Sequence, residues 1–106
     1  YFGIRVGDDG DWAFQRDHAL AVLGIDERLV GPVHIHLDLD VLDPAEFPHV
    51  AYPEGALPVA AAVALIERVA RDADIVGLTI TEFAPVDDAA ALAGSATIAR
   101  LCAAAG

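Results

Sequence analysis

Three apolar stretches of strand character alternate with three stretches of helical periodicity along the 106 residues of the chain. The strands are expected near residues 1–6, 33–41 and 75–80, and each is followed by a segment with apolar residues at helical spacing. Such alternation predicts parallel strands joined by right-handed helical crossovers. The expected fold class is therefore α/β, a parallel sheet with flanking helices in three strand-helix units. The length suits a single segment over residues 1–106.

Each expected helix has a residue suited to its first turn. Asp11 is expected to cap the first helix, Pro58 suits the start of the second, and Asp87 or Asp88 is expected to cap the third. The second helix has a regular apolar face, formed by Val59, Val63, Ile66 and Val69 or Ala70. Between the second strand and this helix, four prolines and a glycine indicate a long ordered loop, and long loops in compact domains are often functional.

The second expected strand carries polar side chains at alternate positions. In "VHIHLDLDVLDP", residues 33–44, the sequence places His34, His36, Asp38 and Asp40 two residues apart. Because strand side chains alternate between faces, these four would share one face while apolar residues occupy the other. A strand buried in a parallel sheet is normally apolar on both faces. The polar face therefore calls for an explanation other than packing.

Three carboxylates are expected at the carboxyl ends of strands, where sites form in open parallel sheets: Asp38 and Asp40 after one strand and Glu82 after the next. Gathered at one edge, they would repel one another unless a cation compensates. An Asp-x-Asp pair can hold two metal ions about 3.5 to 4 Å apart, and carboxylates with some imidazole favour Mg or Mn. The alternative is a purely structural role for the pair, in an Asx-turn or a helix cap.

His34, His36 and Asp43 are not expected to bind a metal ion directly. Six residues of strand extend about 20 Å, so His34 and Asp40 cannot share one metal pair. We expect His34 to be a packed or neutral histidine and His36 to support a metal ligand without binding the metal itself. Asp43, followed by a proline, is expected to form a turn. A His-x-His ligand pair, as in metallo-β-lactamase-like hydrolases or amidohydrolases, would need a histidine at Leu39 or a complete barrel.

Charge narrows the range of partners. The formal net charge is -11 with a pI near 4.3, which disfavours nucleic acid and anionic membranes and favours cations or small cationic substrates. All six positive residues are arginines, so the lysine that steadies the phosphoryl group in haloacid-dehalogenase-like phosphatases is missing. A glycosyltransferase with an Asp-x-Asp motif would need a glycine-rich phosphate cradle or a basic groove, and neither is present.

Compartment is inferred from what the sequence lacks. The single cysteine, Cys102, excludes an internal disulfide, and there is neither a long apolar run nor a basic N-terminal region typical of a signal peptide. A cytoplasmic location is expected.

Several motifs together resemble the ureohydrolase family, which includes arginase, agmatinase and formimidoylglutamase. "HLDLDVLDP", residues 36–44, is similar to that family's Ser-x-Asp-x-Asp-x-x-Asp-Pro motif. "PEG" at 53–55, the helix after it, and "TITEFAP" at 79–85 resemble its proline-glycine loop, helix and final Glu-x-x-Pro strand end, and "GIR" at 3–5 resembles an earlier Gly-x-Arg strand. The match corresponds to the last third or so of the family, so we expect Tyr1 to be an internal position of a larger ureohydrolase domain.

The resemblance implies a chemistry and residue roles. It implies a binuclear manganese centre, with Asp38 bridging both ions and Asp40 binding one, and a metal-activated hydroxide that attacks a guanidinium or amidine carbon to cleave a C–N bond and release urea. Glu82 would bind the substrate guanidinium. The remaining ligands belong to Gly-Gly-Asp-His and Asp-Ala-His-x-Asp segments that this chain lacks, so the segment alone is expected to be inactive. No residue of the segment is assigned as catalytic, and arginine, agmatine and formimidoylglutamate remain open as substrates.

The chain departs from the family pattern at three places, one of which is the short stretch between "GIR" and the expected metal strand. His36 stands at the serine position, and "PHVAYPEGA", residues 48–56, replaces a glycine-rich substrate loop. Two alternatives therefore stay open, a catalytically silent α/β domain kept for assembly or interaction and another divalent-metal Asp-x-Asp enzyme. An apolar surface left by missing portions would favour a homo-oligomer.

Overall fold

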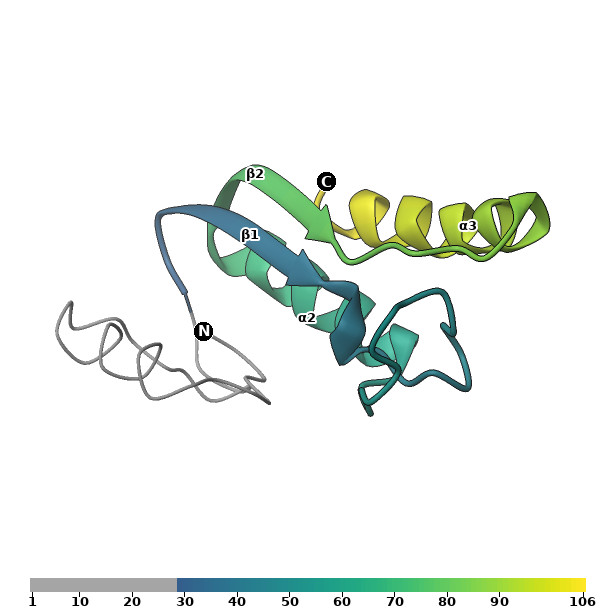
Figure 1. Cartoon of the computed structure of the whole chain (residues 1–106). Coiled ribbons are helices and arrows are strands. Elements are labelled where there is room, and N and C mark those ends of the chain that lie inside the picture. The colour runs from purple at the N-terminus through teal and green to yellow at the C-terminus, as the bar shows by residue number, and fades with distance from the viewer. Residues whose placement is uncertain (1–28) are drawn as a thin grey trace, which may run out of the picture.

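The computed structural model describes residues 29–106, and Figure 1 shows their arrangement. The expected first strand at residues 1–6 and the first helix, with its cap at Asp11, lie outside the described residues. The described elements are the strand β1 (Pro32–Asp38), the one-turn 3-10 helix η1 (Leu39–Val41), the helix α2 (Val59–Asp72), the strand β2 (Asp74–Thr81) and the helix α3 (Asp88–Ala104).

The strands β1 and β2 pair in parallel, with α2 in the connection between them. The register runs from Pro32 opposite Asp74 to Asp38 opposite Thr81, with one irregularity between Val33 and His34. Parallel pairing needs such a crossover, and an α-helix is its usual form. The predicted α/β class, with a parallel sheet and helices, is therefore confirmed.

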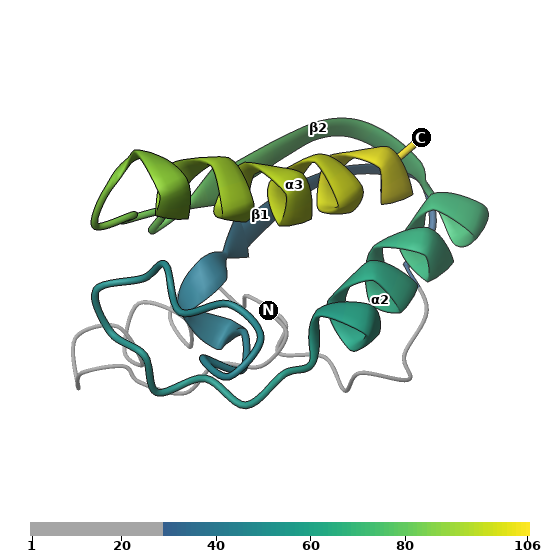
Figure 2. The ribbon, with the colours of Figure 1, turned by 90° about the vertical axis from the view of Figure 1, so that its right-hand side faces the viewer.

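The core lies between one face of this strand pair and both helices, and it continues into the loop after β1. Figure 2 shows α3 running across the strands with α2 beside it. The predicted apolar face of α2 is confirmed, since Val59, Val63, Ile66 and Val69 are all buried. The largest fully buried side chains are Phe47, Leu39, Leu42 and Leu101. Two of these, Leu39 and Leu42, lie on either side of Asp40 in the sequence. The core therefore reaches the turn that carries Asp40.

The helix starts match the sequence expectation. Asp87 caps α3 by accepting a hydrogen bond from the amide of Ala90 at 2.7 Å, so of the two candidates Asp87 is the cap and Asp88 lies in the first turn. Pro58 lies immediately before α2, where its missing N–H leaves no unpaired donor. Neither α2 nor α3, the α-helices of the described part, has the length and apolar character needed to span a membrane.

Candidate functional site

The acidic motif forms a tight turn at the end of β1 and not a continuous strand. The sequence predicted strand through residue 41, but β1 ends at Asp38 and the next three residues form η1. Oδ1 of Asp38 accepts a hydrogen bond from the amide of Asp40 at 2.8 Å, which starts the turn. The expectation that the two carboxylates alternate on one strand face is therefore wrong, because a side-chain cap competes with continued pairing at this position.

The turn brings Asp40 to the edge of the core. Asp40 is 7% exposed, the only buried charged residue among residues 29–106, and its Oδ1 is a buried oxygen. Asp38 is half-buried beside it. Placing a carboxylate in such surroundings is costly unless a counter-charge or a metal ion compensates. The hydrogen bond from the Asp40 amide to Asp38 fixes the position of this carboxylate at the end of β1.

The loop after the turn, residues 42–58, is fastened back onto it. The carbonyl of Val41 accepts hydrogen bonds from the amides of Ala56 at 3.2 Å and Leu57 at 2.9 Å, and the amide of Asp43 donates to Leu57 at 2.8 Å. A Cβ atom at Gly55 would collide with the backbone oxygens of Asp40 and Leu42. The "PEG" motif therefore places a residue without a side chain directly against the acidic turn.

Asp43 forms the turn that its sequence context predicted. Its Oδ1 accepts from the amide of Ala45 at 2.9 Å, and its carbonyl accepts from the amide of Phe47 at 2.9 Å. This arrangement orders the chain around Pro44 and directs Phe47 into the core. The interpretation of Asp43 as turn chemistry is confirmed.

Glu82 follows the last residue of β2 and has a φ angle of 72°, the only non-glycine residue with positive φ among residues 29–106. Such a conformation costs of the order of 1–3 kcal/mol and persists only where surrounding contacts enforce it. Because Thr81 pairs with Asp38, Glu82 and the acidic turn leave adjacent strands at the same edge of the sheet. The structure therefore brings the carboxylate motifs to one edge, and Glu82 is exposed there.

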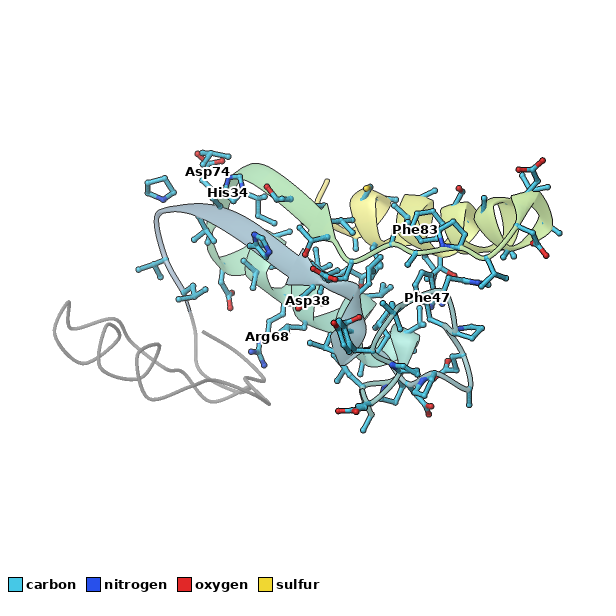
Figure 3. The ribbon with its side chains drawn as sticks, in the orientation of Figure 1. His34, Asp38, Phe47, Arg68, Asp74 and Phe83 are labelled. Atoms are coloured by element: carbon cyan, nitrogen blue, oxygen red, sulfur yellow. The ribbon has the colours of Figure 1, made fainter. Side chains whose placement is uncertain are left out.

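The two histidines of β1 bond across the strands to threonines of β2. Nε2 of His36 lies 3.3 Å from Oγ1 of Thr81, and Nε2 of His34 lies 2.8 Å from Oγ1 of Thr79. His36 thus contacts the residue that immediately precedes Glu82. His34 is exposed, and its ring lies against Gly77, where a Cβ would come within 2.5 Å of Nδ1. Figure 3 shows His34 and Asp38 at opposite ends of β1, so they cannot share one site.

The residues present fit part of a divalent-metal site. Carboxylate oxygens are the ligands that Mg and Mn favour. Within residues 29–106, no three His, Cys, Asp or Glu side chains lie close enough together to hold a metal ion. Asp38 and Asp40 are the candidate ligands of this part, and further ligands would have to come from elsewhere. Metal binding by these two residues stays a prediction, as does substrate binding by Glu82.

Sequence reasoning missed a cluster of three rings next to the site. Phe47 and His49 of the loop meet Phe83, the neighbour of Glu82, with ring centroids 5.0 Å apart for Phe47–His49, 6.1 Å for Phe47–Phe83 and 6.5 Å for His49–Phe83. Figure 3 shows Phe47 and Phe83 between the loop and α3. The sequence did contain a signal for this cluster. Phe47 and His49 follow the aspartate motif, and Phe83 directly follows Glu82.

Comparison with solved structures places the fold. Arginase from Bacillus subtilis superimposes with a TM-score of 0.76 at 20% identity, covering 98% of this chain and 43% of that one. At this identity the likeness establishes the fold alone. This chain spans less than half the length of that enzyme.

Two shorter matches have higher sequence identity. Agmatine ureohydrolase of Thermoplasma volcanium is 34% identical with a TM-score of 0.54, and proclavaminate amidino hydrolase from Streptomyces clavuligerus is 29% identical with a TM-score of 0.55. Each match covers 70% of this chain and 26% of the other. A search of curated protein sequences gave no match.

The sequence itself was also compared with models of protein families. The model described as the arginase family matches residues 1–105, which is nearly the whole chain. The resemblance based on the acidic turn, the "PEG" loop and the Glu82 strand end is thus confirmed, and this chain belongs to the arginase family.

Proposed function

We propose that this chain is part of a manganese-dependent hydrolase that cleaves a C–N bond in a linear guanidine or amidine. One observation carries the proposal: the Asp38–Asp40 turn and Glu82 leave neighbouring parallel strands at the same edge, in a chain of the arginase family. The chain covers a minority of the length of its solved relatives, so the activity is proposed for a complete protein that contains it.

In this proposal, Asp38 and Asp40 contribute two carboxylates to a binuclear manganese centre, and the remaining ligands come from outside the described residues. The metal pair, when bound, supplies the activated water that reacts with the substrate. Asp38 can serve as turn cap and ligand together. Its Oδ1 accepts the amide of Asp40, and a carboxylate has about four acceptor sites on its two oxygens.

Glu82 has a different role in the proposal. Its exposed carboxylate accepts hydrogen bonds from the guanidinium or amidinium group, a charge-assisted pairing that orients the reacting carbon toward the metal edge. The net charge of -11 supports a cationic substrate, because the surrounding field attracts it.

The test uses a preparation of the complete gene product. We expect Asp38→Ala or Asp40→Ala to abolish manganese-stimulated urea release from arginine and agmatine while the circular dichroism spectrum stays native. Glu82→Gln is expected to impair substrate use more than manganese content. Full activity in either aspartate variant would contradict the proposal, and equal loss of substrate use and manganese in Glu82→Gln would make that residue a ligand or a fold element.

A catalytically silent domain is the second candidate, and one observation favours it. The hydrogen bond from the Asp40 amide to Asp38 gives Asp38 a structural role that needs no metal. Equilibrium dialysis against manganese separates the two candidates. The hydrolase binds manganese, and Asp40→Asn lowers that binding; the silent domain binds none at micromolar concentrations.

A further inference from the structure

Glu82 adopts an unfavourable backbone conformation, and contacts on both of its sides enforce it. On the N-terminal side, Thr81 is paired in the sheet, and its Oγ1 atom lies 3.3 Å from Nε2 of His36. On the C-terminal side, the amide of Ala84 donates to the carbonyl of His49 at 2.8 Å. The loop of residues 42–58 is therefore bonded to the chain just after Glu82.

Ring packing strengthens this second attachment. Phe83 lies against Gly94 of α3, where a Cβ atom would come within 2.5 Å of Cε1 of Phe83 and 3.1 Å of Cδ2 of His49. The His49 ring is nearly perpendicular to both Phe47 and Phe83, with interplanar angles of 86° and 88°. Phe47 is fully buried and anchors the group in the core. The three rings, which we call the Phe47–His49–Phe83 cluster, thus connect the loop, Glu82 and α3.

We propose that the Phe47–His49–Phe83 cluster positions Glu82 for the guanidinium or amidinium group of the substrate, with His49 as the residue through which the loop acts. The identity of the substrate group in this inference rests on the proposed function. The positioning of Glu82 rests on the contacts described above. His49 lies in the stretch "PHVAYPEGA", the same part of the loop that contains Gly55. His49 is a positioning residue, since its contacts are with Phe47 and Phe83 and with the backbone of Ala84.

The experiment compares His49→Ala, which removes the ring, with His49→Phe, which keeps one, in the complete gene product loaded with manganese. Val86→Ala is the matched control, because Val86 lies in the same connection after β2 and is 91% exposed. Four quantities are measured: KM and kcat with agmatine and arginine, bound manganese, and amide hydrogen exchange of residues 81–85 and 36–42. Amide hydrogen exchange reports local opening of the backbone. It therefore detects a loss of positioning even where enzyme activity is not measured.

For His49→Ala we expect KM to rise about tenfold with kcat and bound manganese nearly unchanged, and exchange at 81–85 to accelerate about tenfold while 36–42 stays protected. His49→Phe and Val86→Ala should resemble the unmodified protein. Unchanged exchange at 81–85 in His49→Ala would overturn the inference, and so would parallel loss of kcat, manganese and protection at both segments. If the unmodified protein hydrolyses no guanidine, the proposed function fails, and the exchange result alone decides whether the cluster holds Glu82.

Discussion

Gly55 lies so close to the turn that carries Asp40 that a single Cβ atom would strike the backbone oxygens of both Asp40 and Leu42. The carbonyl of Val41, between those two residues, accepts two hydrogen bonds from the same loop, from Ala56 and Leu57. The position of a buried carboxylate therefore depends on the absence of a side chain fifteen residues later in the chain.

Gly55→Ala should displace the acidic turn. We expect the free energy of unfolding to fall by about 1–3 kcal/mol, because the added methyl group forces the backbone apart. Manganese affinity should fall as well, since Asp40 moves with its turn. Urea denaturation and manganese titration measure the two effects. Ala56→Ser, at an exposed neighbouring position, is the control, and a Gly55→Ala protein with the same stability as that control would refute the close approach.

Substitution of Asp38 should separate its two roles. Asp38→Asn keeps an oxygen that accepts the Asp40 amide, so the free energy of unfolding should change by less than about 0.5 kcal/mol, while manganese affinity falls at least about tenfold because the charge is lost. Asp38→Ala should lose about 1 kcal/mol in addition, because the cap is removed. Isothermal titration with manganese and thermal unfolding of both variants provide the comparison. Undiminished manganese binding by Asp38→Asn would exclude it as a charged ligand.

Glu82→Gly should uncouple stability from substrate use. Glycine adopts a φ of 72° without strain, so the variant should be as stable as the original protein or more stable by up to about 1 kcal/mol. Guanidine hydrolysis should nonetheless fall sharply, because the carboxylate is missing. Glu82→Gln, which keeps the strained backbone, is the companion variant. A loss of more than about 1 kcal/mol in Glu82→Gly would show that the side chain itself stabilises the fold.

Asp87→Ala should weaken the start of α3. Loss of the hydrogen bond to the Ala90 amide is expected to cost about 1 kcal/mol of unfolding free energy. Asp88→Ala, one residue later, removes only a favourable charge near the helix N-terminus and should cost less, about 0.3–1 kcal/mol. Denaturant midpoints of the two variants test the order. Equal effects, or a larger effect for Asp88→Ala, would contradict the assignment of Asp87 as the cap.

Features that depend on local periodicity were predictable from the sequence. The apolar face of α2 and the strand β2 follow from side-chain spacing, because such patterns report the faces that an element buries, and residue type limited the cap of α3 to Asp87 or Asp88. The acidic motifs were found because carboxylates gathered at one edge of a sheet repel one another unless a cation compensates. Family membership followed from the combination of those motifs with the loop.

Features that depend on contacts distant in sequence, or on a local cap that competes with strand pairing, were not predicted. Alternating residues suggested strand through Val41, but one hydrogen bond from the Asp40 amide to Asp38 ends it earlier. The positive φ of Glu82 has no local signal, since glutamate is not a residue that favours it. Nor does spacing reveal that Phe83 packs on Gly94, eleven residues away, or that both meet His49. The positive φ of Glu82 and the packing of Phe83, Gly94 and His49 arise from tertiary contacts, whereas the early end of β1 arises from a local side-chain cap.

The loop of residues 42–58 supports Asp40 through Gly55 and the chain after Glu82 through His49. It is consequently a poor module for protein engineering by loop exchange. A donor loop that lacks a glycine at position 55 would disturb the acidic turn, and one that lacks a ring at position 49 would leave Phe83 and Gly94 without their partner. A successful graft would have to carry positions 49, 55, 83 and 94 together, because the loop and the residues that support it pack as one unit.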